Sequence, residues 1–341
     1  MAIEPGPDRR SARWARRLRD DLRLTEVGVS RRATARVRGR VSEGRLRVEL
    51  TGAGAADFTR DFEADDEGAA HATADALLLA LTERAGGFDS TLVFARRTGR
   101  GRKDIFRVRV DGAGPVRVSS GRGVALLPAL AHGDVWYSVL DRGSLFVTHT
   151  GVDERPVIGG DGLTMGVTGC GDGIAFSTNR DGDAEIYRAD RDGSNPRRVT
   201  FHDGIDVSPA CSGRGELAFV SSRGGAPSLL LMPEGALHPV RPPQPEAHLQ
   251  TPTWCPDPDR RVLAFTRVDR ASSVWTLDLD DGALTRVSAP GGSYQDPAFS
   301  PDCRAVAYAG RDGLWLARAD GSARRRVVRG RVHTVRWGRL R

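Results

Sequence analysis

The stretch that decides the fold runs from Ala175 to Thr200 and reads AFSTNRDGDAEIYRADRDGSNPRRVT. An apolar run leads into a polar turn, then into a segment of alternating apolar and polar residues, and then into a second Asp-Gly pair. Alternation with a period of two predicts strands, and Asp-Gly predicts tight turns between them. The spacing of Asp181, Asp183 and Glu185 leaves a calcium loop open as an alternative.

The same pattern recurs with a period of about 43 residues along the chain. Related stretches begin at Leu92, Val135, Leu217, Leu263 and Val306. Short segments between them, such as DVSPACS, QTPTWCP and QDPAFSP, each predict one further strand. Four short strands per repeat are typical of the blade of a β-propeller.

We therefore expect a mainly β chain with a six-bladed β-propeller over residues 88–341, preceded by a small α/β domain over residues 1–87. The unit that begins at Leu92 has only three strands of its own. The C-terminal HTVRWGRLR has the character of the strand between units. We expect this last strand to complete the first blade and close the ring, which hides two otherwise unpaired edges.

The acidic pairs of the opening stretch recur at equivalent turns, which favours turn chemistry over metal binding. The equivalents of Asp192-Gly193 are Asp111-Gly112, Asp281-Gly282 and Asp320-Gly321. A calcium loop of the EF type has glycine at its sixth position, and counting from Asp181 that position is Ile186. We expect no metal and no cofactor.

The small domain shows two helical patterns and one hairpin. Trp14, Ala15, Leu18 and Leu22 share one side of a helix, and two predicted strands meet at a turn at Glu43-Gly44. A second helix, in the segment from Asp65, has an apolar face. That face comprises Ala70, Ala74, Leu77 and Leu81.

Charge and hydropathy argue against nucleic acid as a partner and against a membrane-spanning segment. The formal charge is +7, but the first 50 residues hold fourteen Arg against seven Asp and Glu, so the rest of the chain is balanced. A nucleic-acid-binding domain carries a basic face, and none is expected here. No run reaches the ~18 apolar residues of a membrane span, and no signal peptide is visible at the start.

The four cysteines, Cys170, Cys211, Cys255 and Cys303, lie 41, 44 and 48 residues apart, one to a repeat. No CxxC pair supports a zinc or redox site. A disulfide needs Cα atoms within about 7 Å, which the differing positions in neighbouring blades disfavour. We expect four free, buried thiols.

The repeat, DxxPxWSPDGxxIAFxSxRxGxxxIYxxDxDGxxxRRLT, resembles that of the TolB family, and the opening stretch matches it nearly throughout. The stretches ATARVRGRVSEGRLRVELTGAG and DDEGAAHATADALLLALTERAGGFDSTLVFARR are similar to the N-terminal domain of that family, so the resemblance covers roughly residues 15–341. Peptidases of the prolyl oligopeptidase type share such repeats, but the sequence holds no G-x-S-x-G motif, and we expect no hydrolase domain after the closing strand.

The resemblance implies a non-enzymatic scaffold of the periplasmic Tol–Pal system, which supports outer-membrane integrity and cell division. Its partner would be the peptidoglycan-associated lipoprotein Pal, and we expect a monomer. Family members begin with a signal peptide, a TolA-binding segment and a first strand, all of which we expect to be missing here, through either a late start or a shortened paralogue. Other Tol proteins are further candidate partners, although the TolA-binding segment is expected to be absent.

The loops that lead into the innermost strands share one face with the turns between second and third strands, and this face is the candidate partner-binding site. Its candidate residues are His202, Asp203, His248, Gln250, Tyr294, Gln295 and His333. Two alternatives remain. The three histidines, if they converge, would suit a metal-dependent lyase, and the missing signal peptide would suit a cytoplasmic interaction propeller.

Overall fold

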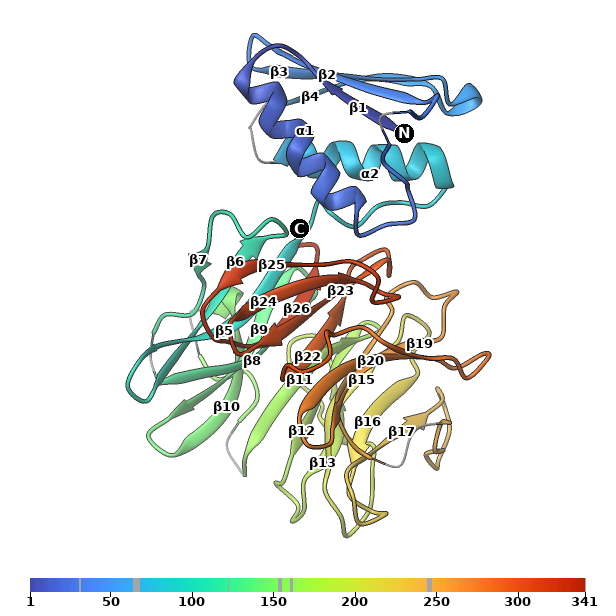
Figure 1. Cartoon of the computed structure of the whole chain (residues 1–341). Coiled ribbons are helices and arrows are strands. Elements are labelled where there is room, and N and C mark those ends of the chain that lie inside the picture. The colour runs from blue at the N-terminus through green and yellow to red at the C-terminus, as the bar shows by residue number, and fades with distance from the viewer. Residues whose placement is uncertain are drawn as a thin grey trace. The chain divides into compact units, whose positions relative to one another are not determined.

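The computed structural model describes residues 1–30, 32–63, 68–121, 123–152, 155–159, 162–243 and 247–340. The chain divides into two compact units, Met1–Ser90 with Arg109–Ala113, and Thr91–Val108 with Gly114–Arg341 (Figure 1). Within the described ranges, no helix is long and apolar enough to cross a membrane. The acidic residues that open the second predicted helical segment, 65–67, lie outside these ranges.

The first unit is a four-stranded sheet with two helices. Its elements are β1 (Ala2–Pro5), α1 (Arg9–Leu22), β2 (Arg36–Ser42), β3 (Arg45–Thr51), the 3-10 helix η1 (Gly54–Ala56), β4 (Phe58–Glu63) and α2 (Gly68–Thr82). The sheet order is β1-β2-β3-β4, with β1 parallel to β2 and the other pairs antiparallel. The expectation that a first strand is missing is therefore wrong. Four residues, AIEP, are too few to show a periodicity.

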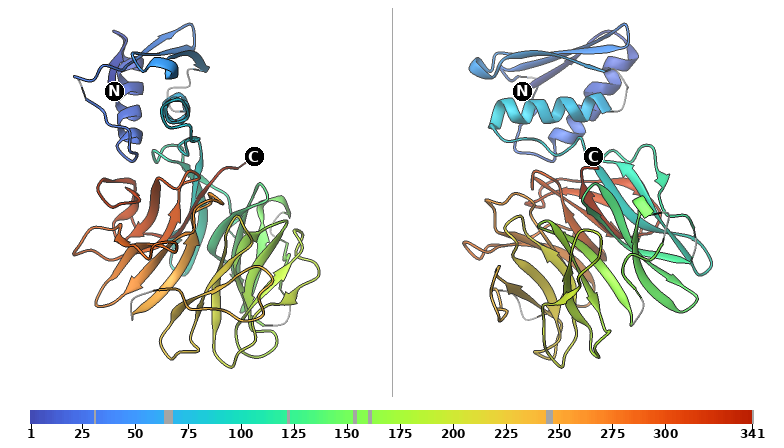
Figure 2. Two further views of the ribbon diagram at one scale, coloured as in Figure 1. Left: turned by 90° about the vertical axis from the view of Figure 1, so that its right-hand side faces the viewer. Right: turned by 180° about the vertical axis from the view of Figure 1, so that it is seen from behind.

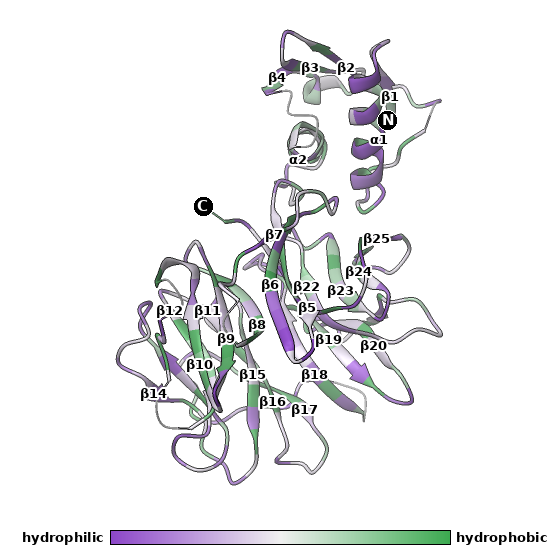
Figure 3. Ribbon diagram, turned by 90° about the vertical axis from the view of Figure 1, so that its left-hand side faces the viewer, coloured by the Kyte–Doolittle hydropathy of each residue, from purple (hydrophilic) through white to green (hydrophobic). Residues whose placement is uncertain are grey.

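Both predicted helices and the predicted hairpin turn are present. Glu43 and Gly44 have φ values of 50° and 77°, the left-handed backbone that a tight turn requires. The predicted apolar face of α1 is buried throughout, whereas the rest of the helix is mostly hydrophilic (Figure 3). The Asp8 carboxylate caps α1 by accepting from the N–H groups of Arg10 and Ser11. On α2 the predicted face is buried except at Leu81, which is half-buried.

A buried histidine is held between carboxylates in this unit. The Nδ1 atom of His71 lies 2.6 Å from Oδ2 of Asp21, and its Nε2 atom lies 3.6 Å from Oδ2 of Asp111, which belongs to the same unit. Burial alone would lower the pKa of His71, but the two carboxylates outweigh burial and raise that pKa to about 9. The imidazolium is therefore the stable form in the folded unit at neutral pH.

This pKa predicts a stability that falls in alkaline solution. The folded-state pKa of His71 lies above its ordinary value of 6.5, so its contribution is complete below pH 6.5 and is lost as the pH rises through about 9. We expect the stability difference between wild type and His71→Gln to shrink over that interval by up to about 3 kcal/mol. Urea unfolding followed by circular dichroism measures it. The exposed His238→Gln is the control, and parallel curves for wild type and His71→Gln would contradict the assignment.

The described residues of the second unit form six antiparallel sheets. The first contains β26 (Val332–Gly338), β5 (Thr91–Gly99), β6 (Arg102–Arg109) and β7 (Val116–Arg117), in that order. The second contains β8 (Val124–Ala131), β9 (Asp134–Asp141) and β10 (Ser144–His149), followed by the 3-10 helix η2 (Thr150–Val152). The third contains β11 (Thr164–Cys170), β12 (Gly173–Thr178), β13 (Glu185–Ala189) and β14 (Arg197–Arg198).

The remaining three sheets follow in chain order. The fourth contains β15 (Asp206–Cys211), β16 (Leu217–Ser221) and β17 (Ser228–Met232). The fifth contains β18 (His248–Trp254), β19 (Val262–Val268), β20 (Ser272–Asp278) and β21 (Leu284–Arg286). The sixth contains β22 (Tyr294–Phe299), β23 (Ala305–Gly310), β24 (Gly313–Arg318) and β25 (Arg324–Arg329).

The innermost strands of these sheets form a closed ring. In order around the ring they are β8, β11, β15, β18, β22 and β26, and each contacts the next, with β26 contacting β8 (Figure 2). The predicted closure is confirmed, because β26 pairs antiparallel with β5 from Val332↔Arg96 to Gly338↔Thr91. The mainly β fold class is confirmed as well.

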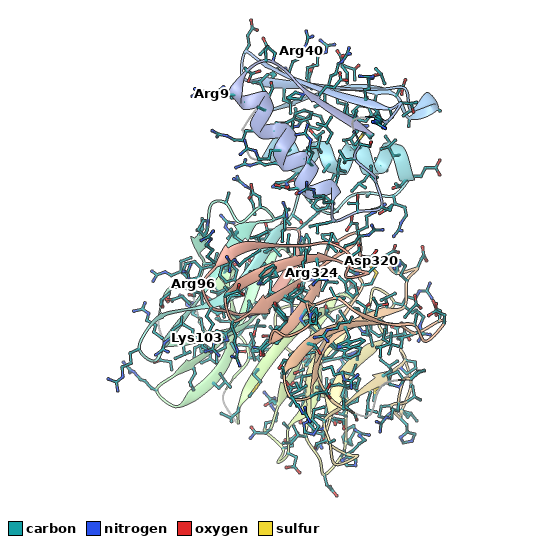
Figure 4. All side chains as sticks on the ribbon, viewed as in Figure 1. Arg9, Arg40, Arg96, Lys103, Asp320 and Arg324 are labelled. Carbon is teal, nitrogen blue, oxygen red and sulfur yellow. A yellow bond between two sulfur atoms is a disulfide. The ribbon has the colours of Figure 1, made fainter. Side chains whose placement is uncertain are left out.

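The repeated sequence features occupy equivalent places. Each second strand buries an aromatic ring at an equivalent position, and β9 buries Trp136 in addition. The residues at the equivalent position are Phe94, Tyr137, Phe176, Phe219, Phe265 and Tyr308. In the four predicted Asp-Gly turns glycine has a φ between 74° and 84°, and the aspartate accepts from the N–H two residues later, as Asp320 (labelled in Figure 4) does from Ser322. The turn interpretation is confirmed.

The expectation of four free thiols is wrong. Cys170 is bonded to Cys211 and Cys255 to Cys303, with Cα separations of 5.2 and 5.4 Å. Each bond links two neighbouring sheets where their innermost strands end. Sheets converge toward the centre of the ring, so the ends of neighbouring innermost strands lie close together. Two cysteines at different positions of their repeats can therefore still be within bonding distance. Cys303 also lies in the turn after β22, with a φ of 61°, rather than on the strand.

Ring closure predicts a strong dependence on the last strand. A chain that ends at Gly330 lacks Val332, Val335 and Trp337, which are buried, and leaves β5 as an open edge. We expect the free energy of unfolding to fall by at least about 4 kcal/mol, from the lost burial alone, and we expect aggregation. Urea unfolding and gel filtration measure both effects. A chain that lacks only residue 341 is the control, and a monomeric, stable truncated chain would contradict the closure argument.

Candidate functional site

All seven predicted site residues lie where the chain enters an innermost strand, and they come from four neighbouring sheets. His202 and Asp203 precede β15, His248 and Gln250 lie on β18, Tyr294 and Gln295 lie on β22, and His333 lies on β26. Tyr294 and His333 are half-buried and the other five are exposed. Because the innermost strands are equivalent members of one ring, their first residues share one end of it.

The innermost strands carry a common bulge close to this end. In each of them the pairing with the second strand shifts at one residue with positive φ. These residues are Leu127, Gly166, Ser208, Thr251, Asp296 and Thr334, with φ values between 41° and 68°. Two of their N–H groups donate across to the preceding sheet, from Gly166 to Ser138 Oγ and from Asp296 to Thr266 Oγ1. Such bulges re-aim neighbouring side chains.

The residue before each bulge residue defines a set that we call the rim ring. It consists of Leu126, Met165, Val207, Gln250, Gln295 and His333. The members in the second, third and fourth sheets are apolar, and those in the fifth, sixth and first sheets are polar. The rim ring therefore has one apolar half and one polar half, a mixture that suits protein recognition better than binding of a single small ligand.

Three exposed apolar side chains extend the apolar half of the rim ring. Leu163 precedes β11, and Phe201 and Ile205 precede β15, with exposed fractions of 45%, 72% and 52%. Large apolar side chains that are exposed on loops at one end of the ring are candidates for an interaction surface. Sequence reasoning missed these residues because it searched the loops for polar groups. The available signal was the sequence FHDGI at residues 201–205, which places an aromatic and an aliphatic residue in a predicted loop.

The polar half is held by local hydrogen bonds. Gln295 Nε2 donates to Oδ2 of Asp296, whose carboxylate also accepts from the N–H of Thr334, so it joins the sixth sheet to the first. Burial, Lys103 (labelled on β6 in Figure 4) and Arg331 lower the pKa of His333, while Asp296 opposes them. His333 is therefore neutral at pH 7 and can both donate and accept hydrogen bonds. Tyr294 packs edge-on against Tyr308 and Trp315.

The predicted metal alternatives find no support in the geometry. Among the residues that the structure describes, no three His, Cys, Asp or Glu side chains are grouped as metal ligands would be. His202, His248 and His333 belong to three different sheets. In the opening stretch, Asp181 accepts a hydrogen bond from the Tyr187 hydroxyl, and Glu185 accepts from three protein donors.

The chain matches the TolB beta propeller domain family, PD40, over residues 79–340. The chain belongs to this family. In fold it is similar to TolB from Acinetobacter baumannii, with a TM-score of 0.81 and 20% identity over 98% of this chain and 95% of that one. It is also similar to a putative TolB from Agrobacterium tumefaciens (TM-score 0.54, 16% identity, 73% and 98% covered). Hydrazine synthase from Kuenenia stuttgartiensis shares the fold as well (TM-score 0.57, 12% identity, 72% and 46% covered).

In this TolB-family propeller a buried carboxylate positions the loop that carries Phe201 and His202. Glu185 is 1% exposed and accepts from the N–H of His202 at 2.6 Å, from Arg198 Nη2 at 2.7 Å and from the Thr200 hydroxyl. The Arg198 guanidinium in turn lies 4.8 Å from the centre of the Phe201 ring. The acidic residue that suggested a metal ligand is thus the anchor of the candidate site.

Replacing this carboxylate should loosen the loop. Glu185→Gln removes the charge from three hydrogen bonds, and we expect a loss of roughly 2–3 kcal/mol in the free energy of unfolding. Asp183→Asn, at an exposed neighbour, should change it by less than about 0.5 kcal/mol. Urea unfolding measures both variants. Equal effects would show that Glu185 does not anchor the loop.

Proposed function

We propose that the second unit is a six-bladed propeller that acts as a non-enzymatic protein-binding scaffold of the Tol–Pal system. Membership of the TolB beta propeller domain family supports this at the level of the fold, and the closed ring of innermost strands supports the blade count. In this proposal residues 1–87 form a separate small domain and residues 88–341 form the propeller.

The observation that carries the proposal is the surface around the rim ring. Leu163, Phe201 and Ile205 offer an exposed apolar patch, and next to it the polar half of the rim ring offers amide and imidazole groups. Protein interfaces combine such an apolar centre with hydrogen-bonding groups at its border. We assign this face to docking of the lipoprotein Pal, with all seven predicted site residues as contacts or as support for contacts.

A scaffold fits the site better than an enzyme does. Hydrazine synthase shows that the fold alone does not decide between them, so the side chains must. No described residues group as metal ligands, and the carboxylates near the rim, Glu185 and Asp296, are used by internal donors. The groups left exposed there among the described residues include amides, imidazoles and apolar side chains, which suit binding of a protein surface.

The two disulfides favour an oxidising compartment. Cys170–Cys211 and Cys255–Cys303 together use all four cysteines of the chain. Structural disulfides persist in the periplasm and are rare in the bacterial cytoplasm. We therefore propose the periplasm as the location and a monomer as the working form, in preference to a cytoplasmic interaction propeller.

Binding of purified Pal, measured by titration calorimetry, tests the function. We expect Phe201→Asp to weaken binding at least about tenfold, because it puts a charge at the centre of the apolar patch. The matched control is Leu237→Asp, which makes the same change at a side chain that is 86% exposed between β17 and β18. It should leave the affinity within about twofold.

Two results would overturn the proposal. One is a wild-type chain that does not bind Pal although it is folded. The other is equal weakening by Phe201→Asp and Leu237→Asp, which would place the contact elsewhere. If Gln295→Ala still binds Pal while Phe201→Asp does not, the interface is restricted to the apolar half of the rim ring.

A further inference from the structure

A cavity of about 150 Å³ lies at the centre of the second unit, further along the innermost strands than the rim ring. Residues from all six innermost strands or their ends line it. Its lining residues include prolines, alanines and the aromatic residues Trp254, Phe299 and Trp337, and the surface they expose to the cavity is more polar than apolar. One charged side chain, Arg336, lines the cavity.

The register of the strands shows that this arginine is an exception within the repeat. In each innermost strand, the residue two places after the bulge residue pairs with a residue of the second strand. That partner directly precedes the buried aromatic residue named above for the same second strand. We call the six residues of the innermost strands the channel ring: Ala129, Thr168, Ala210, Thr253, Ala298 and Arg336. All six line the cavity. Five are small, so the sixth extends a guanidinium into space that small side chains leave open.

The guanidinium has few partners among the described residues. Its Nη1 atom donates to the carbonyl oxygen of Val335 at 2.8 Å, and within the described part of the chain no carboxylate forms an ion pair with it. Asp296 is the carboxylate whose charge acts on it. Oδ2 of Asp296, however, already accepts from Thr334 and Gln295. A cation in such an enclosure has lost much of its hydration without gaining a salt bridge.

Two hydroxyl groups share the cavity with Arg336. Thr168 and Thr253 are half-buried members of the channel ring. Among the described residues, Thr253 Oγ1 has no hydrogen-bond partner and Thr168 Oγ1 makes one long contact, of 3.5 Å, to Gly169. At about 30 Å³ per water, the cavity corresponds to about five water molecules or to one small polyatomic anion.

We propose that this cavity binds a small oxyanion, with Arg336 supplying two charge-assisted hydrogen bonds and Thr168 and Thr253 supplying hydroxyl donors. The planar guanidinium fork matches the two oxygens of a carboxylate or phosphate. The site is separate from the rim ring and does not depend on Pal docking. The anion can be a free phosphate or carboxylate, or a carboxylate at the end of a peptide that reaches into the channel.

Titration calorimetry of the full chain at constant ionic strength tests the proposal, with inorganic phosphate, acetate and a short peptide with a free or an amidated C-terminus. We expect one saturable site in the millimolar range or tighter. Arg336→Ala should weaken binding at least about tenfold. Three channel-ring members are alanine, so this variant should fold, and Arg336→Met, which keeps the length without the charge, serves if it does not. Arg100→Ala, at the exposed β5–β6 turn, is the matched control for net charge.

Each outcome decides something. Binding of phosphate but not acetate assigns a phosphate-type ligand, and preference for the free over the amidated peptide assigns a terminal carboxylate. Absence of saturable binding by the wild type would mean that Arg336 only fills the channel. Equal weakening by Arg336→Ala and Arg100→Ala would reduce the effect to surface charge. Either of the last two results overturns the proposal, and neither bears on Pal binding.

Discussion

The second unit depends on the pairing of its last strand with its first. Val332 to Gly338 supply the innermost strand of a sheet whose other strands begin at Thr91. Without that pairing the innermost strands would form an open arc with an unpaired edge at β5. With it, each sheet packs between two neighbours, which is why every second strand can fully bury an aromatic ring. The rim ring and the channel ring exist only because the arc is closed.

The same repetition gives the site its character. A bulge with a left-handed residue recurs in every innermost strand, so six equivalent positions stand at one end of the ring and six more line its centre. Because the backbone is repeated, side chains alone distinguish one sheet from another. The rim ring is asymmetric because some of its positions hold polar residues, such as Gln250 and His333, and others hold apolar residues, such as Leu126 and Val207. The channel ring is asymmetric because Arg336 is its one charged member. Function in such a scaffold lies in departures from the repeat.

Features that depend on a few neighbouring residues were predictable from the sequence, whereas distances between residues of different sheets were not. The Asp-Gly turns, the helix face at Trp14 and Leu18, and the C-terminal closing strand follow from periodicity and turn chemistry, which act over a few residues. The disulfides were missed because the distance between two sheets near the centre of a ring cannot be read from positions in a repeat. β1 is too short to show a periodicity, and Phe201 lies in a loop where only polar groups were considered as candidate contacts.

The direction of the closing pair has a mechanical consequence. Because β26 and β5 are antiparallel, the last paired residue of β26, Gly338, lies opposite the first residue of β5, Thr91. A pulling force applied through the two outgoing chain ends therefore acts at the same end of the pair. It opens the hydrogen bonds one at a time, as in unzipping, rather than loading them together in shear. The seam between β26 and β5 therefore yields to tension between the two chain ends at a lower force than the same pair would if it were loaded in shear.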